Sequence, residues 1–332
     1  MKGFYWKYLL AIYLLVARLS ATAQTARYNL TDIGSLGGSS GIIRFICDTG
    51  VAAGTSTDTN GNSLAFAWYN GSFTNIGSVI GTAYPSDCIG VNSHNKVGVT
   101  ANKGGGITNT YMYDLSASAS QNTVGACLTE NDEIFGMDSS NQPFRWKNSQ
   151  LLELWQLGIT TAFSPSAANK LGDIAGNNAY FHTSTGGDGS YPSPPGFYLN
   201  PYSSISTCGM NMLGDVIGQF SYSPYNYGYL YKVAKPNDVT GVGVALPLLG
   251  SATYARTYCI NDQRQIGGTS GGRAVLWTIS AKSIEIEDLN NLIPAGSGYT
   301  LTQANSINNL GWIGCRATYG SQTSYMVILK PN

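Results

Sequence analysis

Short apolar stretches separated by polar, glycine-containing turns recur along the chain. In the clearest example, Met210 ends one apolar stretch, a turn begins at Asn211, and Val216 to Gly218 forms a second apolar stretch. Asn or Asp at the start of a turn can hydrogen-bond the backbone two residues on, and Gly or Asn further along accepts a positive φ. A glycine in a buried strand is typical of a place where a neighbouring backbone comes close. The pattern therefore predicts two strands joined by a tight turn.

Seven copies of this pattern can be aligned on the position of Asn211. The aligned positions are 47, 92, 129, 169, 211, 261 and 308, and the copies at Asn92 and Asn308 are one residue shorter than the others. Successive copies lie 37 to 50 residues apart. A period of roughly 40–50 residues, with several short strands in each unit, is typical of a β-propeller blade.

An apolar, aromatic stretch follows each copy, for example Leu64 to Trp68 in the first repeat and Phe197 to Leu199 in the fourth. In the first repeat Asn70-Gly71 joins two alternating runs, which is a strong hairpin signal. The last repeat has few residues after its aromatic stretch, and segment 27–34 resembles the outer strand of the first repeat. A strand shared in this way would leave no open sheet edge. We therefore predict an all-β fold: a seven-bladed β-propeller closed by an N-terminal strand joining the last blade, in a single domain of seven repeats over residues 24–332.

Residues 1–23 have the features of a signal peptide. Lys2 and Lys7 precede an apolar core of residues 8–16, and Ala21-Thr22-Ala23 matches a small-x-small cleavage site. No later stretch is long and apolar enough to span a bilayer. We therefore expect an exported protein, secreted or periplasmic, with no membrane span after signal removal.

Charge is sparse along this chain and evenly divided. Only 11% of residues are charged, with 18 bases and 18 acids, against roughly 25% in a typical soluble domain. No block of like charge exists, which argues against a nucleic-acid partner. We expect a monomer.

The six cysteines follow the repeat rather than a metal-binding spacing. Four of them precede the aligned Asn position by two to four residues, and the sequence has no Cys-x-x-Cys pair. Such phasing predicts small apolar side chains that face the core, and free cysteine is among the most buried residue types. Disulfides are the alternative, because an even number of cysteines in an exported chain permits them. The residues are Cys47, Cys88, Cys127, Cys208, Cys259 and Cys315.

Three motifs together resemble a known bacterial repeat. They are Asn-Leu-Thr-Asp-Ile-Gly-Ser-Leu-Gly-Gly at 29–38, Ile-Asn-Asp with a following Ile-Gly-Gly at 260–268, and Leu-Ala-Phe-Ala-Trp at 64–68. They are similar to the HAF-type extracellular repeat, whose phrases are D-L-G-x-L-G-G, I-N-D-x-G-x-V-V-G and H-A-F-x-W. The resemblance covers most of residues 27–329, although Leu64 stands where the name motif has His and the middle repeats keep only the skeleton. It implies export and a repeated β architecture, and it implies no activity and no catalytic residues.

Two polar clusters are candidates for a cation. Asp58, Asn60 and Asn62 place oxygen ligands at alternate positions, as in the first half of a calcium loop, but the closing glutamate is missing. A plain Asn-Gly turn explains the same residues. Residues 130–133 gather three acids on one turn, where they could bind a cation or flank a glycosidic bond. A solvated turn is the alternative there.

No catalytic motif is found in the sequence. The two histidines, His94 and His182, lie in different repeats, and a metal centre normally needs three or four ligands. We expect His94 to be an exposed turn residue and Thr183 to Gly196 to be a surface loop. The chain has no Gly-x-Ser-x-Gly elbow, phosphate loop or dinucleotide motif in a suitable context.

A tyrosine-rich run provides the best candidate for ligand binding. Tyr222, Tyr225 and Tyr227 are expected in a loop, where exposed aromatic rings beside Asn and Ser suit the recognition of a sugar or a protein. The alternative is that these rings pack on the loop itself.

These observations favour an exported binding or scaffold module for a protein or glycan, with no catalysis and no cofactor identified beyond the weak calcium candidate. The alternative is a propeller-type polysaccharide lyase or hydrolase that uses carboxylates or tyrosines at the channel mouth, and a third possibility is a structural surface repeat. One architecture hosts many functions, so the fold cannot decide between them. The enzyme predicts acids and tyrosines that converge at one end of the channel, whereas the binding module predicts an exposed patch of Tyr222, Tyr225 and Tyr227.

Overall fold

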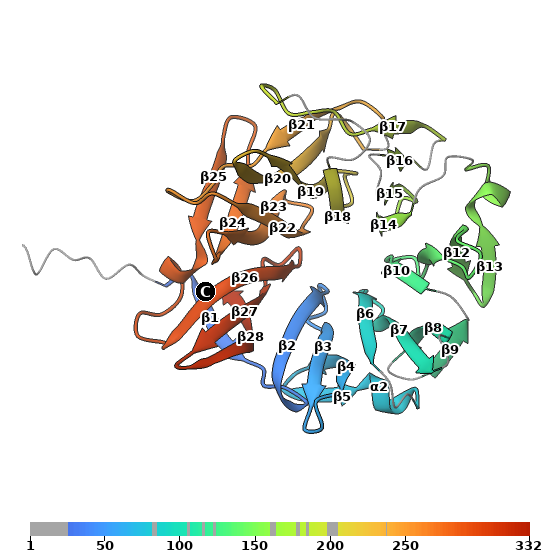
Figure 1. Ribbon diagram of the computed structural model, residues 1–332, viewed down its shortest axis with the longest axis horizontal. Helices are drawn as coiled ribbons and strands as arrows, with labels where there is room; N and C mark the ends of the chain where they lie inside the picture. The colour runs from blue at the N-terminus through green and yellow to red at the C-terminus, as the bar shows by residue number, and fades with distance from the viewer. Residues whose placement is uncertain are drawn as a thin grey trace, which may run out of the picture.

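The fold is an all-β propeller, as the repeats predict. A computed structural model of the chain describes residues 26–81, 85–104, 107–114, 117–121, 124–159, 164–176, 180–183, 186–197, 205–236 and 238–332. Within these residues the strands form four-stranded antiparallel sheets that stand around a ring (Figure 1). Strand pairing divides them into seven sheets. The predicted signal peptide, residues 1–23, lies outside the described part of the chain.

Each sheet, called a blade from here on, is a meander that runs from an innermost strand to an outer one (Figure 1). The strands are β2 (Gly37–Ile46), β3 (Ala52–Asp58), β4 (Ser63–Tyr69) and β5 (Ser72–Asn75) in blade 1; β6 (Ser86–Val91), β7 (Lys96–Gly104), β8 (Ile107–Asp114) and β9 (Ala117–Gln121) in blade 2; β10 (Val124–Leu128), β11 (Ile134–Met137), β12 (Pro143–Lys147) and β13 (Gln150–Glu153) in blade 3; β14 (Pro165–Ala168), β15 (Ile174–Gly176), β16 (Tyr180–His182) and β17 (Asp188–Ser190) in blade 4; β18 (Ile205–Met210), β19 (Val216–Tyr222), β20 (Tyr225–Val233) and β21 (Gly241–Ala245) in blade 5; β22 (Ala255–Ile260), β23 (Gln265–Ser270), β24 (Arg273–Ile279) and β25 (Ile284–Asp288) in blade 6; and β26 (Tyr299–Ile307), β27 (Ile313–Tyr319) and β28 (Gln322–Pro331) in blade 7. Short helical turns follow the outer strands of three blades: α2 (Ile76–Val79), η1 (Leu154–Leu157) and η2 (Leu289–Asn291).

The N-terminal strand β1 (Tyr28–Asp32) supplies the outer strand of blade 7. It pairs antiparallel with β28 from Tyr28 opposite Pro331 to Asp32 opposite Val327. The first and last segments of the chain are therefore hydrogen-bonded in one sheet, and the predicted N-terminal outer strand of the last blade is confirmed. This pairing joins the two ends of the chain within one blade and so closes the ring through backbone hydrogen bonds.

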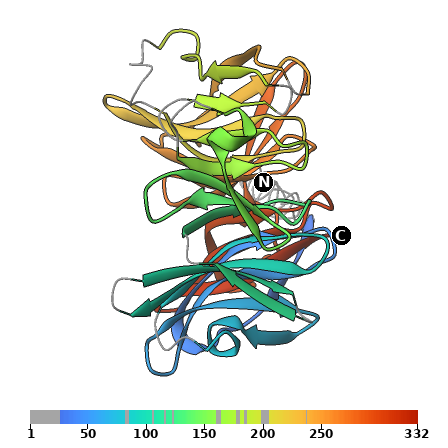
Figure 2. The same ribbon diagram turned by 90° about the vertical axis from the view of Figure 1, so that its right-hand side faces the viewer.

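The strands cross the short dimension of the molecule, as the side view shows (Figure 2). Because the strands of a blade alternate in direction, one face carries the turns that join each first strand to its second, and the opposite face carries the hairpins that join each second strand to its third. We call these the turn face and the hairpin face. The repeated Asn positions lie on the turn face, and the Tyr222–Tyr225 hairpin lies on the other.

All seven copies of the turn have the same length. In each, the N–H at the aligned position donates to the carbonyl oxygen four residues on, from Cys47 to Val51 through to Asn308 to Trp312. The prediction that the copies at Asn92 and Asn308 are shorter is therefore wrong for the turn itself. What differs is the glycine after the turn, which comes one position earlier in those two blades, at Gly98 and Gly314.

Every innermost strand contains a β-bulge near its end, three residues before the aligned position. The bulged residues are Arg44, Ile89, Ala126, Ser166, Cys208, Tyr258 and Asn305. Opposite the bulge, a Cβ on Gly54 would lie 2.0 Å from the Ile42 carbonyl oxygen, and one on Gly218 would lie 2.3 Å from the Ser206 carbonyl oxygen. The close backbone approach predicted from the glycine is confirmed, and the bulge is its cause.

The core lies between neighbouring blades. Each hydrophobic cluster draws side chains from adjacent sheets; one joins Phe66 and Trp68 of blade 1 to Met326 and Ile328 of blade 7. All six cysteines are free, and Cys47, Cys88, Cys127 and Cys315 are buried. The buried free thiols expected from the repeat phase are therefore confirmed for those four. Cys208 departs from the expectation, because it occupies a bulge and is exposed.

Two expectations for blade 4 are wrong. Its third strand is β16, not Phe197 to Leu199: Phe197 lies outside the strands, and 198–199 lie outside the described residues. The predicted surface loop from Thr183 to Gly196 contains strand β17 and the buried Tyr191. Tyr191 packs edge-on against Tyr229 and Tyr231 of blade 5, so this segment serves the core between the two blades.

Candidate functional site

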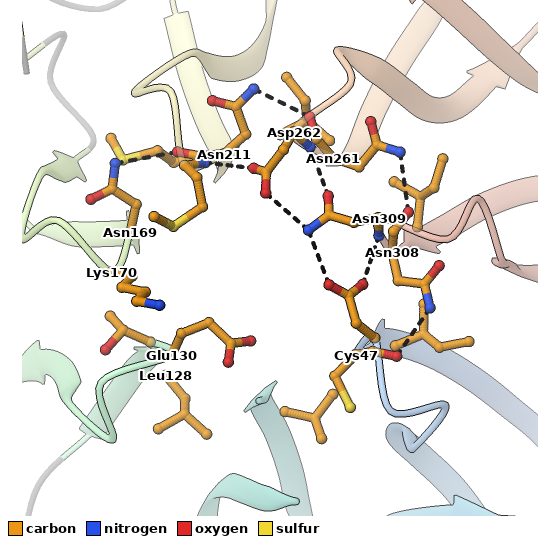
Figure 3. Close-up of a pocket in the computed structure, with 18 of the residues that line it drawn as sticks. Cys47, Leu128, Glu130, Asn169, Lys170, Asn211, Asn261, Asp262, Asn308 and Asn309 are labelled. Carbon is orange, nitrogen blue, oxygen red and sulfur yellow. Dashed lines mark hydrogen bonds between the residues drawn. The ribbon is translucent and has the colours of Figure 1, made fainter. Parts of the chain in front are cut away.

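All seven blades contribute residues to the mouth of the central channel on the turn face. A hollow of about 210 Å³ lies there, lined by the ends of the innermost strands and the first residues of the turns. One apolar residue from each of the seven blades lines it: Ile46, Val91, Leu128, Ala168, Met210, Ile260 and Ile307. The aligned residues of six blades, all but blade 2, and the polar residues that follow them form its rim (Figure 3).

The repeated asparagines connect neighbouring blades. Each Oδ1 accepts hydrogen bonds from the backbone N–H groups two and four residues on, as in Asn211 with Leu213 and Asp215. Each Nδ2 donates to the backbone carbonyl of the aligned residue in the next blade. These bonds are Asn92 to Thr129 (3.1 Å), Asn169 to Asn211 (3.3 Å), Asn211 to Asn261 (3.2 Å), Asn261 to Asn308 (3.1 Å) and Asn308 to Cys47 (3.0 Å). The asparagine therefore shapes its own turn and holds the next blade.

Blades 1 and 3 lack the asparagine but keep a link to the next blade. In blade 1, where Cys47 stands, the hydroxyl of Thr49 donates to Oδ1 of Asn95 at 2.9 Å. In blade 3, where Thr129 stands, Nδ2 of Asn131 donates to the Lys170 carbonyl at 2.6 Å. Every boundary between neighbouring blades thus has a side-chain hydrogen bond at the turn face.

A second chain of hydrogen bonds follows the residues after the aligned position (Figure 3). Oδ1 of Asp262 accepts from the Met212 N–H at 2.8 Å, and its Oδ2 accepts from Nδ2 of Asn309 at 2.9 Å. The same Asn309 amide donates to Oδ2 of Asp48 at 3.1 Å, and the Asn309 N–H donates to Oδ1 of Asp48 at 2.8 Å. Both carboxylates are therefore used in connecting blades 5, 6, 7 and 1.

The acidic turn 130–133 is not the simple solvated turn that one of the two interpretations predicted. Glu133 is buried, and its Oε1 lies 3.2 Å from Nζ of Lys147 and 3.8 Å from Arg145. Asp132 accepts from Lys96, His94 and Asn92 of blade 2 at 2.7–3.0 Å. Although partial burial would raise the pKa of the Asp132 carboxyl, these hydrogen bonds dominate and lower it.

Glu130 is the member of that turn that reaches the mouth. Its Oε2 accepts from the Ser93 N–H at 3.0 Å. On the same side, away from the Asp262–Asn309–Asp48 chain, Lys170 extends toward the opening (Figure 3). The lining therefore contains three carboxylates and one ammonium from four blades, and no tyrosine or histidine. The acids converge as the enzyme alternative predicts, but the tyrosines do not.

The three tyrosines proposed for ligand binding lie on the hairpin face, in strands rather than in a loop. Tyr222 ends β19, Tyr225 and Tyr227 belong to β20, and only Ser223 and Pro224 separate the strands. The prediction that these tyrosines lie in a loop is therefore wrong, because Tyr222 of β19 pairs directly with Tyr225 of β20. Tyr222 is 39% exposed and Tyr225 is 38% exposed.

Tyr227 belongs to an aromatic cluster instead of an open patch. Its ring stacks on Phe220 with centroids 5.4 Å apart, and Phe197 meets it edge-on at 5.1 Å. Phe197 also packs edge-on against Tyr222 at 5.1 Å. Packing among the rings therefore explains the position of the Tyr227 ring and covers part of the Tyr222 ring, while Tyr225 remains at the surface.

A pocket of about 480 Å³ adjoins this hairpin, between blades 5, 6 and 7. Pro224 and Asn226 line one side, Tyr254, Arg256 and Tyr258 line the centre, and Thr302 and Gln303 of blade 7 line the other side. Thr253, Thr269 and Gly272 complete it. The lining has two tyrosine rings, one guanidinium and several neutral amide and hydroxyl groups, and no acid.

The positions of these residues follow from the strands. The start of β22 lies beside the Tyr225 hairpin because the Asn226 N–H donates to the Thr253 carbonyl at 3.2 Å. Tyr258 occupies the bulge of β22. Burial raises the pKa of the Tyr258 hydroxyl. The positive charge of Arg256, and a hydrogen bond from its side chain, partly offset that rise. Sequence reasoning missed Tyr254, Arg256 and Tyr258; the available signal was their spacing at every second position along the chain.

The weak calcium candidate forms a hairpin turn between β3 and β4. Oδ1 of Asp58 accepts from the N–H groups of Asn60 and Asn62 at 2.9 and 2.8 Å, and its Oδ2 accepts from Nδ2 of Asn62 at 3.0 Å. These hydrogen bonds lower the pKa of Asp58, with that from the Asn62 side chain the largest cause. The plain-turn interpretation accounts for this geometry, and the calcium candidate stays a prediction.

The two histidines stay apart in different blades, as their repeats suggest. His94 is an exposed residue of its turn, as predicted, and its Nδ1 lies 3.0 Å from Oδ1 of Asp132. His182 ends β16, and its Nδ1 lies 2.7 Å from Oδ1 of Asp188 on β17. Each imidazole thus has its own carboxylate partner.

Comparison with known proteins supports the fold. No protein-family profile matches the chain, and no curated protein is similar to it in sequence. Among solved structures, it is similar to the extracellular domain of a protein assigned as a one-component system from B. thetaiotaomicron, with 12% identity and a TM-score of 0.52 over 91% of this chain and 39% of that one. It therefore spans well under half of that chain.

Two further structures are similar in architecture. YCF48 from Cyanidioschyzon merolae has 10% identity and a TM-score of 0.51, over 91% of this chain and 98% of that one. The β-propeller domain of the Trilobed protease from Pyrococcus furiosus has 11% identity and a TM-score of 0.47, over 84% and 89%. The likeness to the two structures with TM-scores above 0.5 concerns the fold alone. Within the described residues, no helix is long and apolar enough to cross a membrane.

Proposed function

We propose that this chain is an exported glycan-binding module, a degenerate member of the HAF-type repeat class, and that its ligand occupies the pocket beside Tyr254. The single observation that carries the proposal is the lining of that pocket: aromatic rings beside amide, hydroxyl and guanidinium groups in a concavity of about 480 Å³. Its volume lies within the 300–1,000 Å³ typical of small-ligand sites. The predicted signal peptide supports export.

The chemistry of the pocket suits a sugar. A tyrosine ring gives an apolar face of low conformational entropy with a polar tip, and Asn, Gln and Thr supply donors and acceptors for hydroxyl groups. Tyr254 is 38% exposed, so its ring is available to a ligand. A concave site of this size favours a saccharide unit over the flatter surface of a protein partner.

The test is retention of polysaccharides on the immobilised protein, with released product measured in the same samples. We expect retention without product. Tyr254→Ala should abolish retention and Tyr254→Phe should keep it, whereas the matched control Tyr69→Ala, at a residue 46% exposed on the turn face, should leave it unchanged. No retention of any polysaccharide, or equal retention by Tyr254→Ala, refutes the proposal. Tyr225→Ala tests whether the earlier tyrosine candidate extends the same site.

The second candidate function is the polysaccharide lyase or hydrolase. It is favoured by one observation, the convergence of Asp48, Glu130 and Asp262 on the channel mouth. Against it, Asp48 and Asp262 accept hydrogen bonds from neighbouring blades, and the mouth contains no tyrosine. Product released by the wild-type protein and lost in Glu130→Gln, with no change in Tyr254→Ala, would establish this function in place of the first.

A further inference from the structure

We infer that the sugar bound beside Tyr254 is acidic, with its anionic group on Arg256. This inference rests on the proposed glycan-binding function and specifies its ligand class. The starting observation is that Arg256 belongs to the lining of the pocket and that none of the lining residues is an acid.

Arg256 differs from the other arginines that the structure describes. Five of them pair with carboxylates: Arg27, Arg44, Arg145, Arg264 and Arg273. Arg316 donates to the hydroxyl of Ser324. Within the described residues, Arg256 has no carboxylate within ion-pair distance, and its side chain hydrogen-bonds only the neutral hydroxyl of Tyr258. Its guanidinium therefore carries an uncompensated charge at an exposed site.

The surroundings place that charge where a ligand would meet it. Arg256 lies two residues after Tyr254, which directly precedes β22, and two before Tyr258, which occupies the bulge of that strand, and all three side chains line the same pocket. Asn226 and Gln303 flank it from the neighbouring blades. A guanidinium presents its N–H groups in a planar fork that matches a carboxylate or a sulfate with two parallel hydrogen bonds.

In this arrangement different side chains recognise different parts of one sugar unit. The ring of Tyr254 offers an apolar surface to the pyranose, the amides of Asn226 and Gln303 reach its hydroxyl groups, and Arg256 binds its anionic substituent. A neutral sugar would leave the guanidinium without a partner while displacing its water, which disfavours such a ligand. The charge thus separates acidic from neutral polysaccharides of the same ring structure.

The experiment compares polymers that share a backbone and differ in whether a substituent is charged. Polygalacturonate is paired with its fully methyl-esterified form, and dextran sulfate with dextran. We expect the acidic member of at least one pair to bind about tenfold more tightly than its neutral form, as for one charge-assisted contact. Retention of polygalacturonate would assign a uronate carboxylate, and retention of dextran sulfate alone would assign a sulfate ester. Binding should weaken as salt rises.

Two variants assign the effect to this residue. Arg256→Gln should lower the affinity for the acidic polymer about tenfold and leave that for the neutral one unchanged. The matched control is Lys282→Gln, which removes the same charge from an exposed turn between β24 and β25 on the opposite face. Thermal unfolding of each variant confirms that it is folded.

The possible failures can be told apart. Equal retention of acidic and neutral polymers, unaffected by Arg256→Gln but lost in Tyr254→Ala, overturns the acidic specificity and leaves the glycan-binding proposal intact. An equal loss of acidic binding in Lys282→Gln would show a general charge effect and also overturn the inference. No retention of any polymer refutes both.

Discussion

Replacing Asn211 by Ala should destabilise the propeller far more than its position in a surface turn would suggest. The side chain makes four hydrogen bonds: its Oδ1 accepts from the N–H groups of Leu213 and Asp215, and its Nδ2 donates to the Asn261 carbonyl and to Oδ2 of Asp215. The residue is only 4% exposed. Alanine would leave the N–H groups of Leu213 and Asp215 without their acceptor and would remove one of the two donors to the Asn261 carbonyl, which keeps the Arg264 N–H.

The magnitude follows from these bonds. Each contributes a net 0.5–1.5 kcal/mol, roughly, and buried groups without partners cost at least as much. We expect a loss of about 3 kcal/mol in the free energy of unfolding, and a fall of roughly 5 °C in Tm for a chain of this size. Urea denaturation followed by tryptophan fluorescence measures the first, and a thermal scan measures the second.

The matched control makes the same chemical change where the bonds are exposed. Nδ2 of Asn62 donates to Asp58 in a solvent-exposed hairpin, so Asn62→Ala should cost less than about 1 kcal/mol. If Asn211→Ala and Asn62→Ala shift the midpoint by the same small amount, the repeated asparagine does not hold neighbouring blades together, and the reasoning is refuted.

Three further predictions follow from the same structure. Gly218→Ala should lose about 3 kcal/mol or more of stability, because its Cβ would lie 2.3 Å from a backbone oxygen, whereas Gly209→Ala, which meets only the flexible Ile217 side chain at 3.2 Å, should lose less; equal midpoints in urea would contradict this. The lowered pKa of Asp132 means that its stabilising contribution is present above the unfolded pKa of 3.8 and is lost as pH falls through the folded value. Asp132→Asn should therefore show a smaller loss of stability than wild type between about pH 5 and pH 2, and identical acid dependence would count against the blade 2–3 contact. Burial raises the pKa of Cys88 and Cys127 to about 12 and that of Cys208 to about 11, so native thiols should react slowly with Ellman's reagent at pH 8 and all six should react in urea; one rapidly labelled native thiol would contradict the geometry in which Sγ of Cys208 donates to the Thr257 carbonyl.

At Cys208 the residue as a whole and its sulfur atom differ in their surroundings. The residue as a whole is exposed, yet its sulfur contacts the Thr257 carbonyl at 3.2 Å and the Thr257 hydroxyl at 3.5 Å. Reactivity follows the sulfur rather than the residue, because the thiolate is the nucleophile. Cys208 should therefore react slowly in the native protein even though the residue is exposed.

The sequence by itself determined the repeating unit of this protein. Turn chemistry is local, so Asn211 and the glycines after it predict the strand–turn–strand unit without reference to the rest of the chain. Hydrophobic alternation is local as well, and it places the aromatic third strands in six of the seven repeats. Even the pairing of β1 with β28 could be anticipated, since an unpaired sheet edge is unfavourable wherever the ends of the chain lie.

Only the tertiary structure decided what the repeated residues do and where a ligand could bind. The Asn211 side chain donates to a carbonyl 50 residues away in sequence, and that partner is fixed by how blades pack around the ring. The acids Asp48 and Asp262 meet through Asn309 because the ring brings blades 1, 6 and 7 to one mouth. The pocket of Tyr254, Arg256 and Gln303 joins β22 to the first strand of the next blade, and the bulge that turns Tyr258 toward it has no sequence signature of its own. Local propensity predicts elements, whereas a site between blades depends on contacts between residues that are distant along the chain.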